Sequence, residues 1–223
     1  MLHAWAALFD MDGVLVDNTD FHINAWIQFA QQNGMTLTRE QYVEHINGRV
    51  SADAMAYVFG HPLSPDELTR RTEEKEGIYR TLYLPHRRPT TGLVTFLESL
   101  QQAHIPAAVG TSAPVSNLGY TLDGLALRPY FKTVIDASMV SRGKPDPEIY
   151  QIAAQRVNTP ASRCVVFEDA FAGIEAGLRA GMIVVALATT HSRQELTDTG
   201  ASLIIDDFAG LTPAAVAGLF PSE

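Results

Sequence analysis

Six short apolar runs, each ending at a turn, restrict the folds open to this chain of 223 residues. Each run has the length of a buried strand, and helical patterns separate most of them. The runs are Ala4–Phe9, Ala107–Gly110, Thr133–Ile135, Cys164–Phe167, Ile183–Ala188 and Leu203–Ile205. The clearest helical patterns are Leu93–Leu100 and Pro147–Val157, the second with Asp146 as its N-cap. Strands alternating with helices predict an α/β fold with a doubly wound, Rossmann-like parallel sheet.

One long segment interrupts this alternation, because its signals are helical from about Asn18 to Pro89. Its helix boundaries are marked by two capping-box patterns, Thr38 with Gln41 and Ser64-Pro65 with Glu67, and by the helix stops Gly34 and Gly60. We therefore expect a core made of residues 1–18 and 88–223. An all-helical cap subdomain, residues 19–87, is inserted into it, with hinges near Asn18 and residues 87–90.

Composition excludes several classes of partner. The net charge is −9 and no basic cluster stands out, so we expect neither nucleic acid nor an anionic membrane as a partner. The single cysteine, Cys164, excludes internal disulfides and zinc sites with several cysteines. The apolar start is interrupted by Asp10 and Asp12 and has no basic leader, so we expect no signal peptide and no membrane span. These features predict a cytoplasmic protein, monomeric or weakly dimeric.

Polar residues follow the strand candidates where a ligand would bind, beyond the carboxyl ends of a parallel sheet. They are Asp10 and Asp12, Thr111 and Ser112, Lys144 in the loop after the third run, and Glu168 and Asp169. Four converging carboxylates facing one lysine would repel one another without a cation. Oxygen donors of this kind suit Mg²⁺, which keeps open positions for phosphate oxygens.

Each residue also has a purely structural interpretation. The two N-terminal aspartates could only close a turn, although they do not open a calcium loop, whose sixth and twelfth positions here hold Leu15 and Phe21. Glu168, Asp169 and Thr111 could be helix caps, the first two for a helix starting near Phe171. Lys144 could be a solvated loop residue. All four coincidences in this order are much less probable together.

Four motifs together resemble the haloacid dehalogenase-like superfamily. They are Asp10-Met11-Asp12-Gly13-Val14, Thr111 after an apolar run, Gly143-Lys144-Pro145-Asp146-Pro147, and Phe167-Glu168-Asp169 followed by Ala172-Gly173-Ile174-Glu175-Ala176-Gly177. Within that superfamily, the stretch Asp17 to Trp26 with His22, and Lys75 before Tyr79, are similar to the helical-cap branch. That branch holds β-phosphoglucomutase, sugar-phosphate phosphatases and phosphoglycolate phosphatases.

The resemblance implies a mechanism. Asp10 would be the nucleophile that becomes an aspartyl phosphate, and Asp12 the general acid and later the general base. Mg²⁺ would bind Asp10, the Asp12 carbonyl and Asp169, with Glu168 in support. Lys144 and Thr111 would hold phosphoryl oxygens, with Ser112 as a substrate contact. Gly173 and Gly177 would permit close packing of helix on sheet.

The cap subdomain would act as a lid with His22, Arg49 and Lys75 as substrate contacts. The structural alternatives are a packing histidine, an exposed turn at Arg49, and a solvated helix face in the charged run Glu73-Glu74-Lys75-Glu76. The stretch Gly48-Arg49-Val50-Ser51-Ala52 departs from the Gly-x-Ser-Arg pattern of the mutases. This departure weakens the assignment of the chain to the mutases.

The predicted function is a Mg²⁺-dependent phosphatase for a small sugar or organic-acid phosphate monoester. A β-phosphoglucomutase-type phosphotransferase is the alternative. A hydrolytic dehalogenase would need no metal and gains nothing from Asp12. A phosphorylation-sensing receiver module needs no helical insert of some seventy residues, and an inactive binding module is disfavoured because no motif position is lost.

Overall fold

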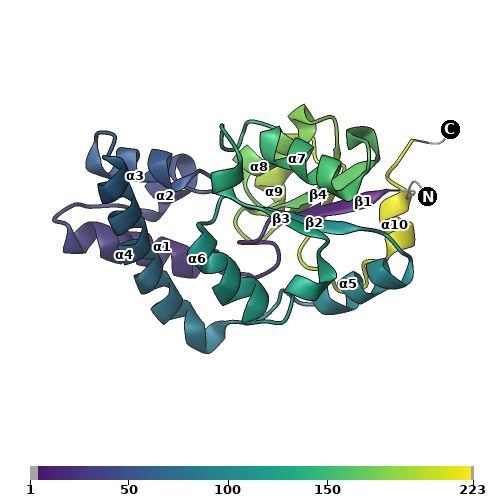
Figure 1. The fold of residues 1–223 in the computed structure, drawn as a ribbon, viewed down its shortest axis with the longest axis horizontal. Helices are drawn as coiled ribbons and strands as arrows, with labels where there is room; N and C mark the ends of the chain where they lie inside the picture. The colour runs from purple at the N-terminus through teal and green to yellow at the C-terminus, as the bar shows by residue number, and fades with distance from the viewer. Residues whose placement is uncertain (1–4, 222–223) are drawn as a thin grey trace.

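The computed structural model describes residues 5–221 as a six-stranded parallel sheet with helices on both faces and a separate helical layer beyond one end (Figure 1). The strand order is β3-β2-β1-β4-β5-β6, and every neighbouring pair is parallel. The strands are β1 (Ala6–Phe9), β2 (Ala107–Gly110), β3 (Thr133–Ile135), β4 (Cys164–Glu168), β5 (Ile183–Leu187) and β6 (Leu203–Ile205). The predicted fold class is confirmed.

Both faces of the sheet are buried, which explains why its strands are continuous apolar runs. The core helices are α5 (Leu93–Gln102), α6 (Val115–Leu118), α7 (Glu148–Val157), α8 (Phe171–Arg179), α9 (Arg193–Leu196) and α10 (Pro213–Ala217). On β1, Ala7 and Phe9 face a cluster with α5, whereas Ala6 and Leu8 face a cluster with α7 and α8. Short 3₁₀ segments cover Leu84–His86, Arg128–Tyr130, Ala137–Met139, Ala161–Arg163 and Thr197–Thr199, and a π-helical turn covers Gly119–Asp123.

Four helices form the cap subdomain: α1 (Thr19–Gln32), α2 (Arg39–His45), α3 (Ser51–Phe59) and α4 (Pro65–Tyr83). They pack around their own apolar cluster, which includes Trp26, Phe29 and Met55. The two connections between the cap subdomain and the core are hydrogen-bonded to each other. Thr90 donates from its backbone N–H to the Leu15 carbonyl at 2.9 Å. Its hydroxyl donates to the Val14 carbonyl at 2.8 Å.

The predicted helix boundaries hold with small corrections. The Thr38–Gln41 capping box is complete, and Gly34 and Gly60 end α1 and α3 with φ of 74°. Ser64 accepts the N–H of Glu67, but the Glu67 carboxylate lies 3.7 Å from Arg70 instead of closing a capping box.

The remaining differences are at element ends. α7 begins at Glu148, one residue later than predicted, because Pro147 takes the N-cap position. The Asp146 carboxylate still accepts the N–H of Glu148, at 3.1 Å. The start of the first predicted strand, Ala4, lies outside the described residues. Between residues 5 and 221, no helix combines the length and the apolar character needed to cross a membrane.

Candidate active site

The carboxyl ends of neighbouring strands bring the predicted polar residues together. Asp10 follows β1, Thr111 follows β2, and Glu168 and Asp169 stand at the end of β4. Because β1 lies between β2 and β4, these ends share one edge of the sheet, and the chain order reverses at β1. The strand ends therefore converge at a topological switch point, as the sequence predicts.

Lys144 links two of these carboxylates below the surface. Its side chain is 1% exposed, and Nζ lies 2.9 Å from Asp10 Oδ1 and 2.6 Å from Glu168 Oε1. Tyr150 on α7 donates to the same Glu168 oxygen at 2.6 Å. The other Glu168 oxygen accepts the backbone N–H groups of the next two residues, at 3.0 and 3.3 Å. Lys144 is thus a buried ion-pair residue rather than a solvated one, and Glu168 is engaged through both oxygens.

Two glycines make room for these carboxylates. A Cβ on Gly13, whose φ is 74°, would overlap the Asp169 carboxylate, and a Cβ on Gly173 would overlap that of Glu168. Gly177 faces Val166 and Val184 of the sheet, where a Cβ would come within 2.8 Å of Val184. The predicted packing role therefore holds for Gly177, whereas Gly173 accommodates a site residue.

Asp10, Glu168 and Asp169 offer oxygens that all lie within 4.8 Å of one another. Burial raises the pKa of Asp10 to about 7 against the pull of Lys144, and Glu168 adds to the rise. Burial and repulsion from Glu168 and Asp10 also raise the pKa of Asp169 well above its usual range. A hard divalent cation would relieve this repulsion, so the donor set fits Mg²⁺. Since Glu168 is already engaged, Asp10 and Asp169 are the side chains of the three best placed to hold an ion.

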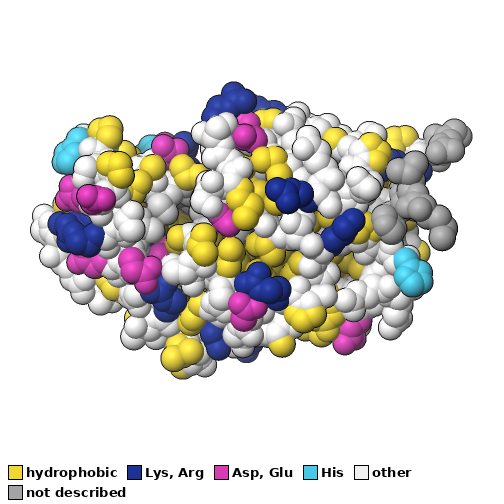
Figure 2. Space-filling view, in the orientation of Figure 1, with side chains coloured by type: hydrophobic (Ala, Val, Ile, Leu, Met, Phe, Trp, Pro, Cys, Tyr) yellow, Lys and Arg dark blue, Asp and Glu magenta, His cyan; other side chains and the backbone are white. Residues whose placement is uncertain are grey.

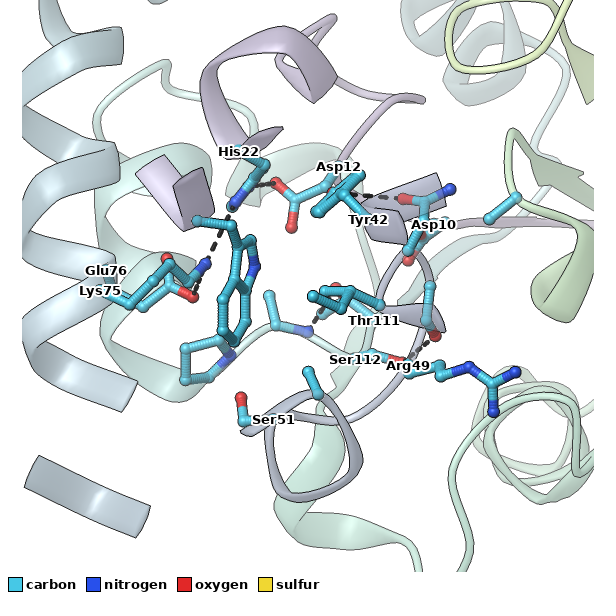
Figure 3. Close-up of a pocket in the computed structure, with 18 of the residues that line it drawn as sticks. Asp10, Asp12, His22, Tyr42, Arg49, Ser51, Lys75, Glu76, Thr111 and Ser112 are labelled. Atoms are coloured by element: carbon cyan, nitrogen blue, oxygen red, sulfur yellow. Dashed lines mark hydrogen bonds and ion pairs between the residues drawn. The ribbon is translucent and has the colours of Figure 1, made fainter. Parts of the chain in front are cut away.

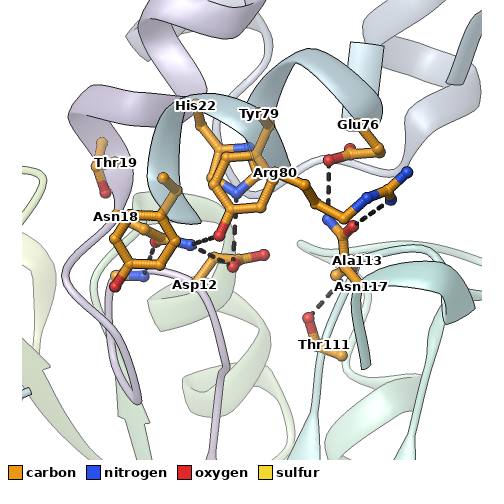
Figure 4. Close-up of polar contacts among 12 residues, drawn as sticks. Asp12, Asn18, Thr19, His22, Glu76, Tyr79, Arg80, Thr111, Ala113 and Asn117 are labelled. Carbon is orange, nitrogen blue, oxygen red and sulfur yellow. Dashed lines mark hydrogen bonds and ion pairs between the residues drawn. The ribbon is translucent and has the colours of Figure 1, made fainter. Parts of the chain in front are cut away.

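Asp12 is held by a different group of residues (Figure 4). Asn18 donates to Asp12 Oδ1 at 2.6 Å and to the Tyr79 hydroxyl at 2.6 Å, and it accepts the N–H of Gly13 at 3.0 Å. His22 Nε2 lies 3.5 Å from the same Asp12 oxygen, and the His22 ring stacks on Tyr79 with 3.8 Å between centroids. Burial alone would raise the pKa of Asp12, but the His22 and Asn18 contacts lower it below its usual value.

The cap subdomain reaches Asp12 through Lys75 and His22. Lys75 is 3% exposed, and its Nζ lies 3.3 Å from His22 Nδ1 and 2.5 Å from Glu76 Oε1. Because an ammonium group can only donate, Nδ1 must accept and the imidazole proton resides on Nε2, facing Asp12. Lys75 therefore sets the His22 tautomer, and the solvated-face interpretation is wrong for Lys75.

Glu76 and Asn117 are site residues that the sequence interpretation missed. Asn117 on α6 donates to Glu76 Oε2 at 2.8 Å and accepts from Arg80 at 3.0 Å (Figure 4). Both Glu76 and Asn117 are buried. The signal was present in α4, where the buried positions follow a helical period: Thr72, Lys75, Glu76, Tyr79 and Tyr83.

These groups surround a central cavity of about 80 Å³ between the core and the cap subdomain (Figure 3). Of the predicted residues, the cavity is lined by Asp10, Asp12, Thr111, Ser112 and Asp169 from the core and by His22, Arg49 and Lys75 from the cap subdomain. Lys144 and Glu168 are not among the lining residues and lie behind Asp10. Asn47 also lines the cavity, and its Nδ2 is a buried donor without a hydrogen-bond partner among the described residues.

Three predicted contacts differ in how they face this cavity. Thr111 is 1% exposed and its hydroxyl oxygen accepts the N–H of Ala113 at 3.0 Å, which leaves its own proton free to donate. Ser112 donates to the Gly48 carbonyl of the cap subdomain at 3.2 Å. Arg49 is exposed, and its guanidinium is directed away from the other labelled residues (Figure 3).

The sheet is Rossmann-like, its strand ends carry carboxylates, and a helical cap covers those ends. This arrangement is typical of a class of hydrolases, and the comparison with protein families agrees. The model described as haloacid dehalogenase-like hydrolase matches residues 6–181. The chain belongs to this family, and the resemblance seen in the four sequence motifs is confirmed.

Known relatives cover nearly the whole chain. It is 35% identical over 197 residues to validoxylamine A 7'-phosphate phosphatase of Streptomyces hygroscopicus subsp. limoneus, covering 86% of this chain and 89% of the relative. It is 34% identical to hexitol phosphatase A of Escherichia coli (strain K12), covering 81% of each chain. Among solved structures, the β-phosphoglucomutase from Clostridium difficile has a TM-score of 0.84 at 25% identity, covering 98% of this chain and 97% of that one.

Proposed function

We propose that this chain is a Mg²⁺-dependent phosphatase that hydrolyses a small sugar or organic-acid phosphate monoester through an aspartyl phosphate on Asp10. The observation that carries the proposal is the central cavity. It has room for only a few water molecules, or a phosphoryl group, and Asp10 and Asp12 both line it. The relatives support a phosphorylated polyol or sugar, since they are named for validoxylamine 7'-phosphate and hexitol phosphates.

In the first step, a carboxylate oxygen of Asp10 attacks phosphorus, and the bond from phosphorus to the alcohol oxygen breaks. Asp12 in its acid form gives its proton to that oxygen, so the alcohol leaves neutral. In the second step Asp12, now a carboxylate, takes a proton from water as the water oxygen attacks phosphorus. Inorganic phosphate leaves, the Asp10 carboxylate is restored and Asp12 is again protonated.

The surrounding residues orient these two carboxylates. Lys144, bridging Asp10 and Glu168, fixes the Asp10 side chain and favours its ionised form. Asn18 and His22 hold Asp12 Oδ1 from two sides and lower the pKa of Asp12. This favours the carboxylate needed for the second step and makes the acid form needed for the first step the minor form in the free protein. The Thr111 hydroxyl is placed to donate to a phosphoryl oxygen. Asp10 and Asp169 would hold Mg²⁺, whose positive charge would offset the negative charge that develops on the phosphoryl oxygens.

The charges in the cap subdomain favour hydrolysis over the phosphotransferase alternative. A mutase of this type must hold a sugar bisphosphate, so a second phosphate needs cationic partners. Lys75 is already paired with Glu76 at 2.5 Å, and the Arg49 guanidinium points away from the cavity (Figure 3). The β-phosphoglucomutase neighbour supports the shared fold, but not a second phosphate site in this chain.

The test is phosphate release from p-nitrophenyl phosphate and a panel of sugar phosphates, with Mg²⁺ or with a chelator. The panel includes β-glucose 1-phosphate with and without glucose 1,6-bisphosphate as a primer. We expect Mg²⁺-dependent phosphate release that Asp10→Asn abolishes, whereas Asp198→Asn, an exposed position outside the cavity, leaves it unchanged. Primer-dependent formation of glucose 6-phosphate without phosphate release would favour the mutase and overturn the phosphatase assignment.

A further inference from the structure

A second and much larger hollow adjoins the central cavity. This side groove has a volume of about 630 Å³, within the range of about 300–1,000 Å³ typical of small-molecule pockets. It lies between the cap subdomain (the start of α3 and one side of α4) and the core loops that follow β2 and β3. The groove and the cavity share Ser51, Ser112, Ala113 and Pro114 as lining residues. The small side chains of Ser51 and Ala113 mark the seam where the cap subdomain meets the core.

The lining of the side groove contains no lysine, arginine or histidine. Its two charged residues are both acidic: Glu73, which pairs with Arg80, and Asp136, which accepts from Ser138. Much of the remaining wall is apolar and includes Val50 and Val115. Hydrophobic side chains accordingly gather in the middle of this face, between the cap subdomain and the core (Figure 2). A second phosphate or a carboxylate would meet repulsion from Asp136 and no lysine, arginine or histidine in the lining. Arg80, which donates to Ser116 of the lining at 3.3 Å, is already paired with Glu73.

One polar group in this wall is without a partner. Thr72 on α4 lines the groove and is 9% exposed, and its Oγ1 is buried without a hydrogen bond to any described residue. Two other threonines of α4 satisfy their hydroxyls within the helix: Thr69 donates to the Pro65 carbonyl and Thr81 to the Gly77 carbonyl, both at 2.9 Å. A buried hydroxyl that lacks this bond is costly unless another molecule supplies a partner.

We propose that the side groove binds the alcohol portion of the substrate. The substrate is then the monophosphate of an uncharged polyhydroxy compound larger than one sugar ring. The proposal rests on the function proposed above. The phosphoryl group occupies the central cavity, and the alcohol passes the seam at Ser51 and Ala113 when the cap subdomain moves. The same movement uncovers Thr72 Oγ1, which is buried in this structure and then bonds to one of the hydroxyls of the alcohol. An apolar face of the alcohol packs on Val50 and Val115. The acidic lining rejects bisphosphates.

The test compares kcat/KM for trehalose 6-phosphate, glucose 6-phosphate, fructose 1,6-bisphosphate and p-nitrophenyl phosphate. We expect the disaccharide phosphate to be the best of the sugar esters and the bisphosphate to be the poorest. Thr72→Val should lower the ratio of kcat/KM for trehalose 6-phosphate to kcat/KM for p-nitrophenyl phosphate about tenfold, mainly through KM. This change corresponds to about 1.4 kcal/mol of lost discrimination between the two substrates. The matched control is Thr81→Val, which removes a threonine hydroxyl from the same helix outside the groove.

A second variant tests charge rejection. Val115 is 60% exposed, so Val115→Lys should fold. It should raise the ratio of kcat/KM for fructose 1,6-bisphosphate to kcat/KM for trehalose 6-phosphate about tenfold. Met139 is 50% exposed and lies outside the groove lining, so Met139→Lys is the control for a new surface charge. A wild-type preference for the bisphosphate, or equal effects of each variant and its control, would overturn the proposal.

Failure of the two proposals can be told apart. If the chain hydrolyses aryl phosphate but not trehalose 6-phosphate, the phosphatase assignment stands and the side-groove proposal is wrong. If it hydrolyses no ester, the phosphatase assignment is wrong. Calorimetry of trehalose 6-phosphate binding to the Asp10→Asn variant then tests the side-groove proposal. Binding that Thr72→Val weakens supports the proposal, and absence of binding overturns it.

Discussion

Replacing Asp10 by asparagine should stabilise the metal-free protein while abolishing turnover. Asp10 is 7% exposed, and burial raises its pKa from 3.8 to about 7 despite Lys144. Each unit of pKa corresponds to about 1.4 kcal/mol, so ionising Asp10 lowers the free energy of unfolding of the wild type by at most about 4 kcal/mol at pH 8. Asparagine keeps the shape without the charge, and Lys144 keeps its contact with Glu168 at 2.6 Å.

The pH dependence follows from the direction of the shift. Because the pKa of Asp10 is raised in the folded state, its contribution to stability is fully present below pH 3.8 and is lost as the pH rises through about 7. The advantage of Asp10→Asn should therefore be small near pH 4, grow up to about pH 7 and remain constant above it.

The assay is thermal unfolding of both proteins in chelator at several pH values between 4.5 and 8. At about 2–4 °C per kcal/mol for a chain of this size, the variant should melt several degrees higher at pH 8. Saturating Mg²⁺ should raise the wild-type Tm more than the variant Tm, because the ion stabilises the state that binds it. A variant that is less stable than wild type at pH 8 in chelator, or an advantage independent of pH, would refute the reasoning.

Two further pairs of variants test packing and buried charge. Gly173→Ala should lower the free energy of unfolding by about 1–3 kcal/mol, because its Cβ would overlap the Glu168 carboxylate. The control is Gly77→Ala, in an open position of α4, which should raise the free energy of unfolding by up to about 1 kcal/mol. Equal denaturation curves for the two glycine variants would contradict the packing argument. Lys75→Ala should cost about 3–5 kcal/mol because it leaves Glu76 buried and unpaired. In denaturant titrations, Lys75→Met with Glu76→Gln should recover most of that loss. If Lys75→Ala alone were as stable as wild type, the charge of Glu76 would not depend on Lys75 for compensation, and the prediction would be wrong.

The sheet could be predicted from the sequence because it depends on local signals. Each run is almost entirely apolar and ends at an acid, a hydroxyl or a turn. Apart from the start of β1, which is predicted at Ala4 outside the described residues, the strand ends therefore fall within one residue of their predicted positions. The faces could not be assigned in the same way. Ala6 and Ala7 are the same residue type, yet they face opposite layers because α5 covers one side of the sheet and α7 the other. That assignment depends on packing between distant parts of the chain.

The cap residues show the same limit more sharply. The run from Glu73 to Glu76 looks like a solvated helix face, and Glu73 and Glu74 are indeed exposed. Lys75 and Glu76 are buried because α4 packs on α1, where the Lys75 ammonium lies 5.0 Å from the Trp26 ring centroid. No local signal in α4 states which helix covers it. Helical periodicity could have indicated the buried stripe, but not its partners.

The charge of the central cavity gives a reason for Mg²⁺ that is independent of family resemblance. The lining includes the carboxylates of Asp10, Asp12, Asp169 and Glu76. Lys75 is already paired with Glu76, and Lys144, behind the wall, already lies between Asp10 and Glu168. A phosphate monoester brings further negative charge into this low-dielectric space, where like charges repel strongly. Two charges on one cation held by oxygen ligands would offset that repulsion at the point where Asp10 must approach phosphorus. For this reason we expect chelation to remove phosphate binding as well as turnover, and phosphate should bind the metal-free chain only when the pH falls far enough to protonate Asp10.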